Sequence, residues 1–124
     1  MRLRSSEAKV FKALAEKPLT VKELETETEL SHRIIAEALE RLTGLGAVER
    51  FSDYTMGPRR VRWRRLVDDE ELRWLLVREA VDPLLDEYGV EAVEAILDAI
   101  SQRPELLSHL KSKLSREVEG SAKR

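Results

Sequence analysis

The chain of 124 residues lacks two residue types and has little of a third. It contains no cysteine and no asparagine, and its single glutamine is Gln102. The absence of cysteine excludes disulfide bridges, thiolate catalysis and cysteine-ligated metals. Charged residues make up 37% of the chain. This preference for ion pairs over thermolabile amides predicts a source that grows at high temperature, that is, a thermophile.

Long apolar runs are also missing. None approaches the roughly 20 residues needed to cross a bilayer, and the N-terminal stretch MRLRSSEAKVF has no apolar region of the kind found in signal peptides. We therefore expect a cytoplasmic protein with no membrane partner.

Motifs for catalysis are absent as well. The sequence has no glycine-rich phosphate loop and no serine nucleophile elbow, so we expect a protein that is not an enzyme. His32 and His109 lie far apart with no cysteine near them, and no carboxylates are spaced as a metal motif. We expect no metal site, no cofactor and no small-molecule effector.

Positive charge is concentrated in one short stretch, although the formal net charge of the chain is −2. Residues 59–66 read RRVRWRRL and hold five arginines and no acidic residue. Residues 67–104, which follow, hold 11 acidic residues against 3 basic ones. This partition predicts that the arginine stretch contacts nucleic acid. The alternative is that the arginines form ion pairs with the acidic residues 68–71 just beyond them.

Three short helices are predicted within the first 46 residues. Residues 5–17 place apolar side chains at helical spacing and end before Pro18. Thr20 and Glu23 fit a capping box at the start of a second helix. Ser31 caps a third helix, SHRIIAEALERLTGLG. Its apolar side consists of Ile35, Ala38, Leu39 and Leu42.

After Gly46 the pattern changes to that of a β-hairpin. Residues 47–51 and 60–66 are predicted strands, joined by the loop SDYTMGPR. In the second strand Arg60, Arg62 and Arg64 alternate with apolar residues and are expected to project outward. Trp63 is expected to anchor the hairpin on the core rather than to stack on a base.

From Asp68 the chain is predicted to be helical again. Pro83 either kinks the first of these helices or separates it from a second one, and Gly89 is a predicted stop. Three apolar stripes lie within residues 67–119, and so short a segment cannot bury all of them alone. We expect them to form a homodimer, with a different protein partner as the alternative. The expected dimerisation residues are Leu72, Leu75, Leu76, Val93, Leu97, Ile100, Leu107, Leu110 and Leu114. Residues 120–124 are expected to form a flexible tail.

Three pieces of sequence in residues 1–66 carry a resemblance. They are PLTVKELETETELS, SHRIIAEALERLTGLGAVER and SDYTMGPRRVRWR. Together they resemble the second helix, third helix and wing of the winged helix-turn-helix superfamily of transcriptional regulators. The whole layout looks like that of the penicillinase-repressor and arsenic-sensor repressor families. The resemblance implies a mainly α fold, in which three helices and a two-stranded wing are followed by C-terminal helices at 67–119.

The resemblance also implies a function. In that superfamily the third helix enters the major groove of DNA, the wing touches a neighbouring groove or the backbone, and terminal helices make the dimer. We therefore expect a transcriptional regulator that binds double-stranded DNA as a homodimer at an inverted-repeat site. The expected DNA-binding residues are Ser31, His32, Arg33, Glu37, Arg41, Arg59, Arg60, Arg62 and Arg64.

The glutamates of the second and third helices depart from this pattern, because a carboxylate repels phosphate. Glu37 and Glu40 lie on the expected recognition surface. A glutamate can still accept a hydrogen bond from a cytosine amino group. His32 is equally consistent with a DNA contact and with a solvated helix start. The alternative function is a winged-helix adaptor that binds other proteins in a replication, transcription or membrane-remodelling assembly.

Overall fold

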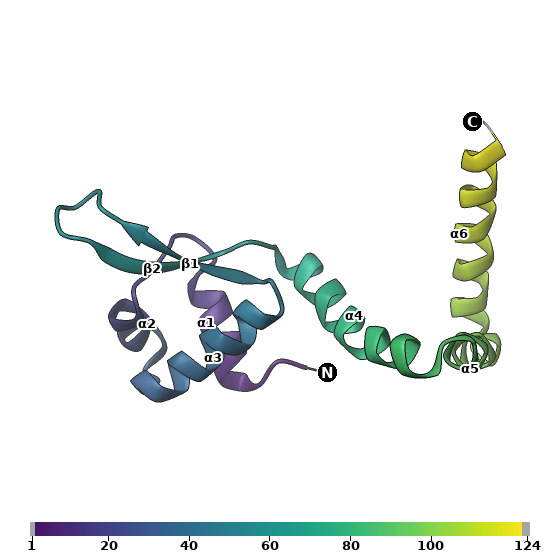
Figure 1. Ribbon diagram of the computed structural model, residues 1–124, viewed down its shortest axis with the longest axis horizontal. Coiled ribbons are helices and arrows are strands. Elements are labelled where there is room, and N and C mark those ends of the chain that lie inside the picture. The colour runs from purple at the N-terminus through teal and green to yellow at the C-terminus, as the bar shows by residue number, and fades with distance from the viewer. Residues whose placement is uncertain (1, 123–124) are drawn as a thin grey trace. The chain divides into compact units, whose positions relative to one another are not determined.

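The computed structural model describes the backbone of residues 2–122 and the side chains of residues 2–118. It is mainly helical, with one two-stranded antiparallel sheet (Figure 1). The contacts divide the chain into two compact units, Met1–Val81 and Asp82–Arg124. The elements in order are α1 (Ser5–Ala13), α2 (Val21–Thr28), α3 (His32–Gly44), β1 (Val48–Asp53), β2 (Arg60–Arg65), α4 (Asp69–Tyr88), α5 (Val90–Ser101) and α6 (Pro104–Ala122).

The second and third helices begin at the caps that the sequence predicts, whereas the N-cap of α1 is Arg4. The Thr20 hydroxyl accepts a hydrogen bond from the Glu23 N–H, and the Glu23 carboxylate accepts one from the Thr20 N–H, each at 3.1 Å. The Ser31 hydroxyl accepts from the N–H of Ile34 at 3.3 Å, so α3 starts one residue later. The first helix ends at Ala13, earlier than predicted. Each cap satisfies a backbone donor that the helix itself leaves unpaired.

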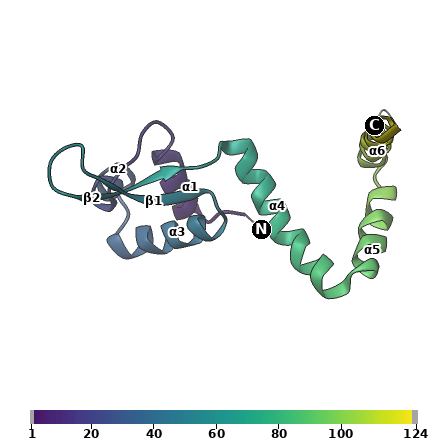
Figure 2. The same cartoon turned by 45° about the horizontal axis from the view of Figure 1, so that its top comes forward.

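The core of the first unit lies between α1, α2 and α3 and the inner side of the hairpin. Figures 1 and 2 show the three helices packed against one another, with β1 and β2 continuing from them. Burial of each leucine or isoleucine side chain contributes about 1.5–3 kcal/mol to folding. The buried apolar residues of this core are Val10, Phe11, Leu14, Leu19, Leu24, Ile35, Ala38, Leu39, Leu42, Leu45, Ala47, Val48 and Leu72.

The hairpin is held to the helices by a short third segment of extended chain. Leu19 and Trp63 exchange two backbone hydrogen bonds, at 2.8 and 3.0 Å. Between the strands themselves, the register pairs Val48 with Arg65 and Asp53 with Arg60. The Trp63 side chain is partly buried and packs against the core. The prediction that Trp63 anchors the wing is therefore confirmed.

The start of α4 belongs to the first unit, which corrects two predictions. Leu72 is only 6% exposed and lies in the core, while Leu75 and Leu76 pack against that core. These three leucines therefore complete the N-terminal unit and are not free for a dimer interface. The division between units falls after Val81 rather than after residue 66.

Pro83 lies inside α4, which continues through it to Tyr88, so it does not separate two helices.

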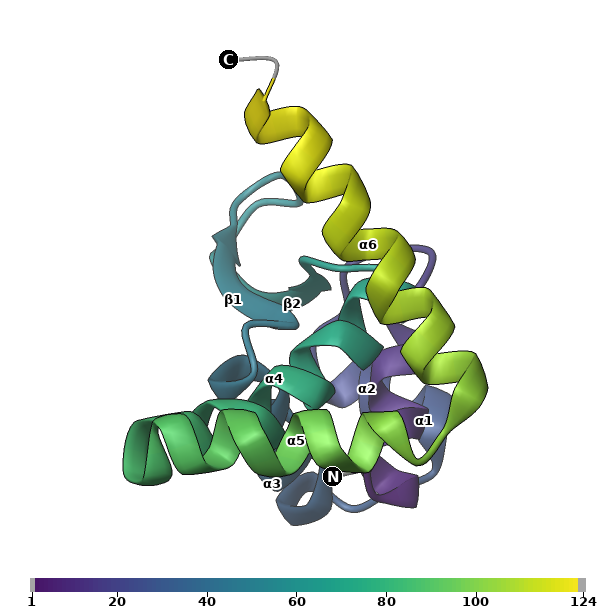
Figure 3. The same cartoon turned by 90° about the vertical axis from the view of Figure 1, so that its right-hand side faces the viewer.

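The second unit contains the end of α4 together with α5 and α6 (Figure 3). Gly89 joins α4 to α5 with a φ of 53°, a backbone conformation that glycine adopts at low cost. Pro104 is the first residue of α6, where its missing N–H is not needed. Among the described residues of this unit, the one buried apolar side chain is Ala92. α6 extends to Ala122, and the last two residues of the expected flexible tail lie outside the described residues.

Candidate nucleic-acid interface

The start of α3 presents an open polar surface. His32, Arg33 and Glu37 are all exposed, and Ile34 beside them is 40% exposed. Arg33 donates to Glu37 one turn on at 3.3 Å, with both side chains largely in solvent. An exposed pair of this kind contributes less than about 1 kcal/mol and reorganises readily. The structure thus brings four predicted contact residues, including the cap Ser31, to one exposed end of α3.

Arg62 is placed differently from the prediction. Its side chain is only 14% exposed and does not project freely outward. Its Nε donates to Asp53 at 2.7 Å, and its NH1 donates to Glu23 of α2 at 2.6 Å. Two carboxylates therefore neutralise this guanidinium, and Arg62 fixes the wing to α2 instead of offering charge to a partner.

The two following arginines are also engaged within the chain. Arg64 pairs with Glu49 directly across the hairpin and lies over the ring of Phe51, 4.6 Å from its centroid. Arg65 lies 3.7 Å from the centroid of Phe11 and donates to the Phe11 carbonyl at 2.7 Å. The predicted row of free arginines is therefore wrong for Arg62 and Arg64.

The alternative interpretation, that the arginines pair with residues 68–71, is correct at one position. Arg65 donates to Asp69 at 3.4 Å. The acidic partners of Arg62 and Arg64 come instead from β1 and α2. Pairing across a hairpin depends on its register, which periodicity along one strand does not reveal.

The tip of the wing keeps its positive charge. We use the name wing tip for residues 54–60, where Tyr54 and Met56 are 65% and 74% exposed. Arg59 donates to the Ser52 hydroxyl at 2.9 Å, and Arg60 is exposed. Within the described part of the chain, neither arginine has a carboxylate partner. The wing tip is therefore a compact cationic surface.

The two carboxylates that hold Arg62 are stabilised in their ionised form. Hydrogen bonds from the hydroxyl and N–H of Thr55, followed by those from Arg62, lower the pKa of Asp53. The Thr20 N–H, followed by the Thr20 hydroxyl and Arg62, lowers the pKa of Glu23. Both groups are charged at neutral pH, so the pairing of Arg62 persists there.

Arg41 is committed to a contact with α4. Its guanidinium makes two parallel hydrogen bonds to the Glu79 carboxylate, one of them 2.6 Å long. These bonds lower the pKa of Glu79 below its usual range. A fork of this kind is geometrically specific and joins α3 to α4. The prediction of Arg41 as a residue at the rim of the DNA groove is corrected accordingly.

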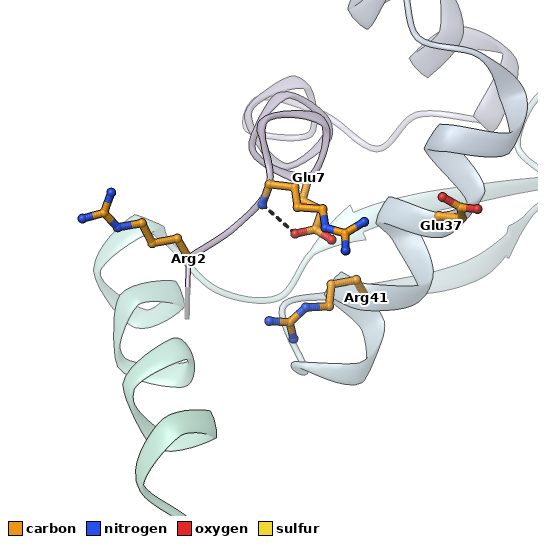
Figure 4. Close-up of a pocket in the computed structure, with 5 residues that line it drawn as sticks. Arg2, Glu7, Glu37 and Arg41 are labelled. Carbon is orange, nitrogen blue, oxygen red and sulfur yellow. Dashed lines mark hydrogen bonds between the residues drawn. The ribbon is translucent and has the colours of Figure 1, made fainter.

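A hollow of about 570 Å³ lies beside α3, lined by Arg2, Arg4, Glu7, Glu37 and Arg41 (Figure 4). Arg2 and Arg4 precede α1, and sequence reasoning did not select them. The signal for them was present, because two arginines flank Leu3 directly before the first helix. What the sequence could not show is that this segment folds back beside α3.

No group of three or more histidine or acidic side chains within residues 2–118 is arranged to hold a metal ion. Nor does any helix in the described part of the chain combine the length and apolarity needed to cross a membrane.

The helices α1 to α3, the turn between α2 and α3 and the β1–β2 wing form a winged helix-turn-helix fold. Solved structures share this fold. A possible transcriptional regulator from Methanosarcina mazei Go1 is 14% identical, with 74% of this chain and 78% of that chain covered and a TM-score of 0.52. A variant of Lactococcus lactis ZitR is 18% identical, with 95% and 77% covered and a TM-score of 0.50. The adhesin competence repressor AdcR from Streptococcus pyogenes is 14% identical, with 86% and 83% covered and a TM-score of 0.50.

At sequence identities this low, the similarity to these solved structures establishes the fold of the chain but not its function. No protein-family model and no curated protein matches the chain.

Proposed function

We propose that this protein is a DNA-binding transcriptional regulator that acts as a homodimer at an inverted-repeat site. Two of the proteins with the same fold are described as a possible transcriptional regulator and as a repressor. The observation that carries the proposal is the pair of unneutralised arginines, Arg59 and Arg60, at the exposed wing tip. Phosphate contacts supply most of the affinity of proteins for duplex DNA, and they need free cations of this kind.

The proposed interface has two parts with different tasks. Arg59 and Arg60 of the wing tip contact phosphates or a narrow minor groove. The exposed start of α3, with Ser31, His32 and Arg33, faces the major groove, where Glu37 can accept from a cytosine amino group. Arg41, Arg62 and Arg64 act as supports that fix α3 and the wing, because their guanidinium groups are already paired.

The homodimer is supported by the apolar faces of the second unit. Of the predicted dimerisation residues, Val93, Leu97 and Leu114 are 45%, 46% and 54% exposed. Ile100, Leu107 and Leu110 are half-buried. Among the described residues, Val93, Leu97 and Leu114 thus remain largely exposed. Symmetric self-association is the commonest way to bury such surfaces.

Charge favours a second copy of the chain as the partner. Residues 82–98 carry six acidic side chains and no basic one. Residues 103–118 carry four basic side chains and two acidic ones. In a symmetric pair, the basic α6 of each copy can lie against the acidic α5 of the other copy. The favourable charge pairing then occurs twice, once on each side of the symmetry axis. The recognition helices of such a dimer would lie about 34 Å apart, one turn of DNA, which requires an inverted repeat.

The test is the salt dependence of binding to a random-sequence duplex. The wild type is compared with a variant carrying Arg59→Ala and Arg60→Ala, and with a charge-matched control carrying Lys9→Ala and Lys12→Ala on α1. If the dimer loses four phosphate contacts, the slope of log affinity against log salt becomes shallower by about 3–4 in the wing-tip variant. The control keeps the wild-type slope. Equal binding by all three proteins, or no binding by any of them, contradicts the proposal.

A second candidate function rests on the acidic side chains of α2 and α3. Glu27, Glu29, Glu37 and Glu40 are exposed near the proposed interface. A surface of this composition suits a basic segment of another protein, which is the adaptor function. The same experiment separates the two, since an adaptor of this kind binds no duplex at any salt concentration.

A further inference from the structure

The hollow beside α3 is lined in part by two arginines from the segment before α1. Arg2 and Arg4 are both exposed, and within residues 2–118 neither side chain has an ion-pair partner. They line the hollow together with Arg41, which comes from α3 (Figure 4). Unpaired guanidinium groups at the edge of a concave surface are typical of a site for an oxyanion.

Two carboxylates share the hollow, those of Glu7 and Glu37. Glu7 is only 7% exposed, and its Oε1 accepts a hydrogen bond from the N–H of Arg4 at 2.8 Å. Glu37 accepts from Arg33 at 3.3 Å on the outer side of α3. Arg41 is neutralised by Glu79. Arg2 and Arg4 therefore face one uncompensated carboxylate, that of Glu7, and the hollow keeps an excess of one positive charge. The positive end of the α1 dipole adds to this excess.

The position of the hollow relates it to the proposed DNA interface. Glu37 lines the hollow and also pairs with Arg33 at the start of α3, so the hollow borders the exposed side of that helix. In Figures 1 and 2 the segment before α1 and the wing loop lie on opposite sides of the helices α1 to α3. A duplex held along α3 thus meets cations from the wing tip on one flank and from Arg2 and Arg4 on the other.

We propose that Arg2 and Arg4 bind a phosphate group in this hollow, and that the phosphate belongs to the DNA backbone beside α3. The identification of DNA as the source rests on the proposed function, whereas phosphate binding by the hollow does not. The volume of about 570 Å³ also suits a free phosphate or a small phosphate-bearing molecule. The DNA backbone and a free phosphate compound present the same phosphate oxygens to the arginines. They differ in whether the phosphate is part of a duplex.

The experiment has two arms and four proteins. These are the wild type, a variant with Arg2→Ala and Arg4→Ala, a charge-retaining variant with both changed to Lys, and the control with Lys9→Ala and Lys12→Ala. Arg2 and Arg4 are exposed, and the α1 cap uses the backbone N–H of Arg4, which alanine keeps. Circular dichroism confirms that each variant is folded.

In the first arm, inorganic phosphate is added and backbone amide shifts are followed by NMR. The proposal expects saturable shifts in residues 4–8 and 37–41 of the wild type and the control, and their loss in the alanine variant. In the second arm, the salt slope of duplex binding is measured. Because one phosphate per subunit is lost, we expect the slope to become shallower by about 2 in the alanine variant of a dimer. It should stay close to the wild-type value in the lysine variant.

Each outcome is decisive. A change in the duplex slope supports the site and identifies DNA as its source. Phosphate shifts that depend on the arginines, with no change in the duplex slope, support the site and assign it to free phosphate. If the wild type binds no duplex but keeps arginine-dependent phosphate shifts, the proposed function fails and the site stands. If the alanine variant equals the control in both arms, the site is overturned while the proposed function is unaffected.

Discussion

At the scale of single residues, the arginines of the wing divide into two groups. Arg62, Arg64 and Arg65 are bound by carboxylates, rings or carbonyls of the same unit, whereas Arg59 and Arg60 are not bound by carboxylates among the described residues. The first group stabilises the wing and the second is free to bind. Substitutions in the two groups should therefore affect different measurements.

Changing Arg62 to Ala should destabilise the fold. The change leaves Asp53 and Glu23 without their cationic partner at a site where the arginine side chain is 14% exposed. We expect a loss of about 1–2 kcal/mol in the free energy of unfolding, measured by urea denaturation. Arg60→Ala is the matched control, and its exposed position predicts a change within about 0.5 kcal/mol. Equal losses in the two variants would show that Arg62 does not support the wing.

Acid should weaken the attachment of the wing. Because the folded-state pKa values of Asp53 and Glu23 are lowered, their stabilisation is fully present above the unfolded values of about 4. It is lost as pH falls through the lowered folded-state values. Denaturation between pH 6 and 2 should therefore show decreasing stability below about pH 4, less steeply in Asp53→Asn than in wild type. An Asp53→Asn protein with the full wild-type dependence would exclude this carboxylate as a source of the acid sensitivity.

At the scale of secondary-structure elements, much of the N-terminal unit could be predicted from sequence because its signals are local. The Thr20 and Ser31 caps, the change of period after Gly46 and the stop at Gly89 each depend on neighbouring residues. Which of the apolar stripes on α4 and α5 is buried could not be predicted in this way. Leu72 and Leu97 both lie on apolar stripes, and only the packing shows that one is 6% exposed and the other 46%.

The candidate site was harder to predict than the fold for a related reason. The start of α3 and the wing tip follow from their own sequence. The neutralisation of Arg62 by Glu23, 39 residues earlier, and of Arg41 by Glu79, 38 residues later, depends on tertiary contacts. The hollow with Arg2 and Arg4 likewise exists because the segment before α1 lies beside α3.

The position of Leu72 in the core leads to a prediction about α4. Leu72→Ala removes buried volume from the first unit and should cost about 2–4 kcal/mol of unfolding free energy. Leu114→Ala on α6 is the matched control, since that side chain is 54% exposed. The control should leave the thermal unfolding of the first unit unchanged. Two variants with the same stability would place Leu72 outside the core.

At the scale of the whole molecule, the second unit has exposed apolar faces and opposite charge on two of its helices. We predict that light scattering gives twice the chain mass of 14.3 kDa. Changing Leu97 and Leu114 to Glu puts charge on these faces and should produce a monomer. A control with Glu at the exposed positions Ala8 and Thr26 of the first unit should remain dimeric. A wild-type monomer would exclude the homodimer and direct the search to a different protein partner.

The proposed function of the whole molecule depends on contact between duplex DNA and one surface of the first unit. The most direct measurement is an NMR map of backbone amide shifts when a random-sequence duplex is added to the full chain. We predict that the largest shifts occur in residues 31–37 at the start of α3 and in residues 54–60 of the wing tip. Shifts confined to α5 and α6, or no shifts at duplex concentrations above those of the protein, would contradict it.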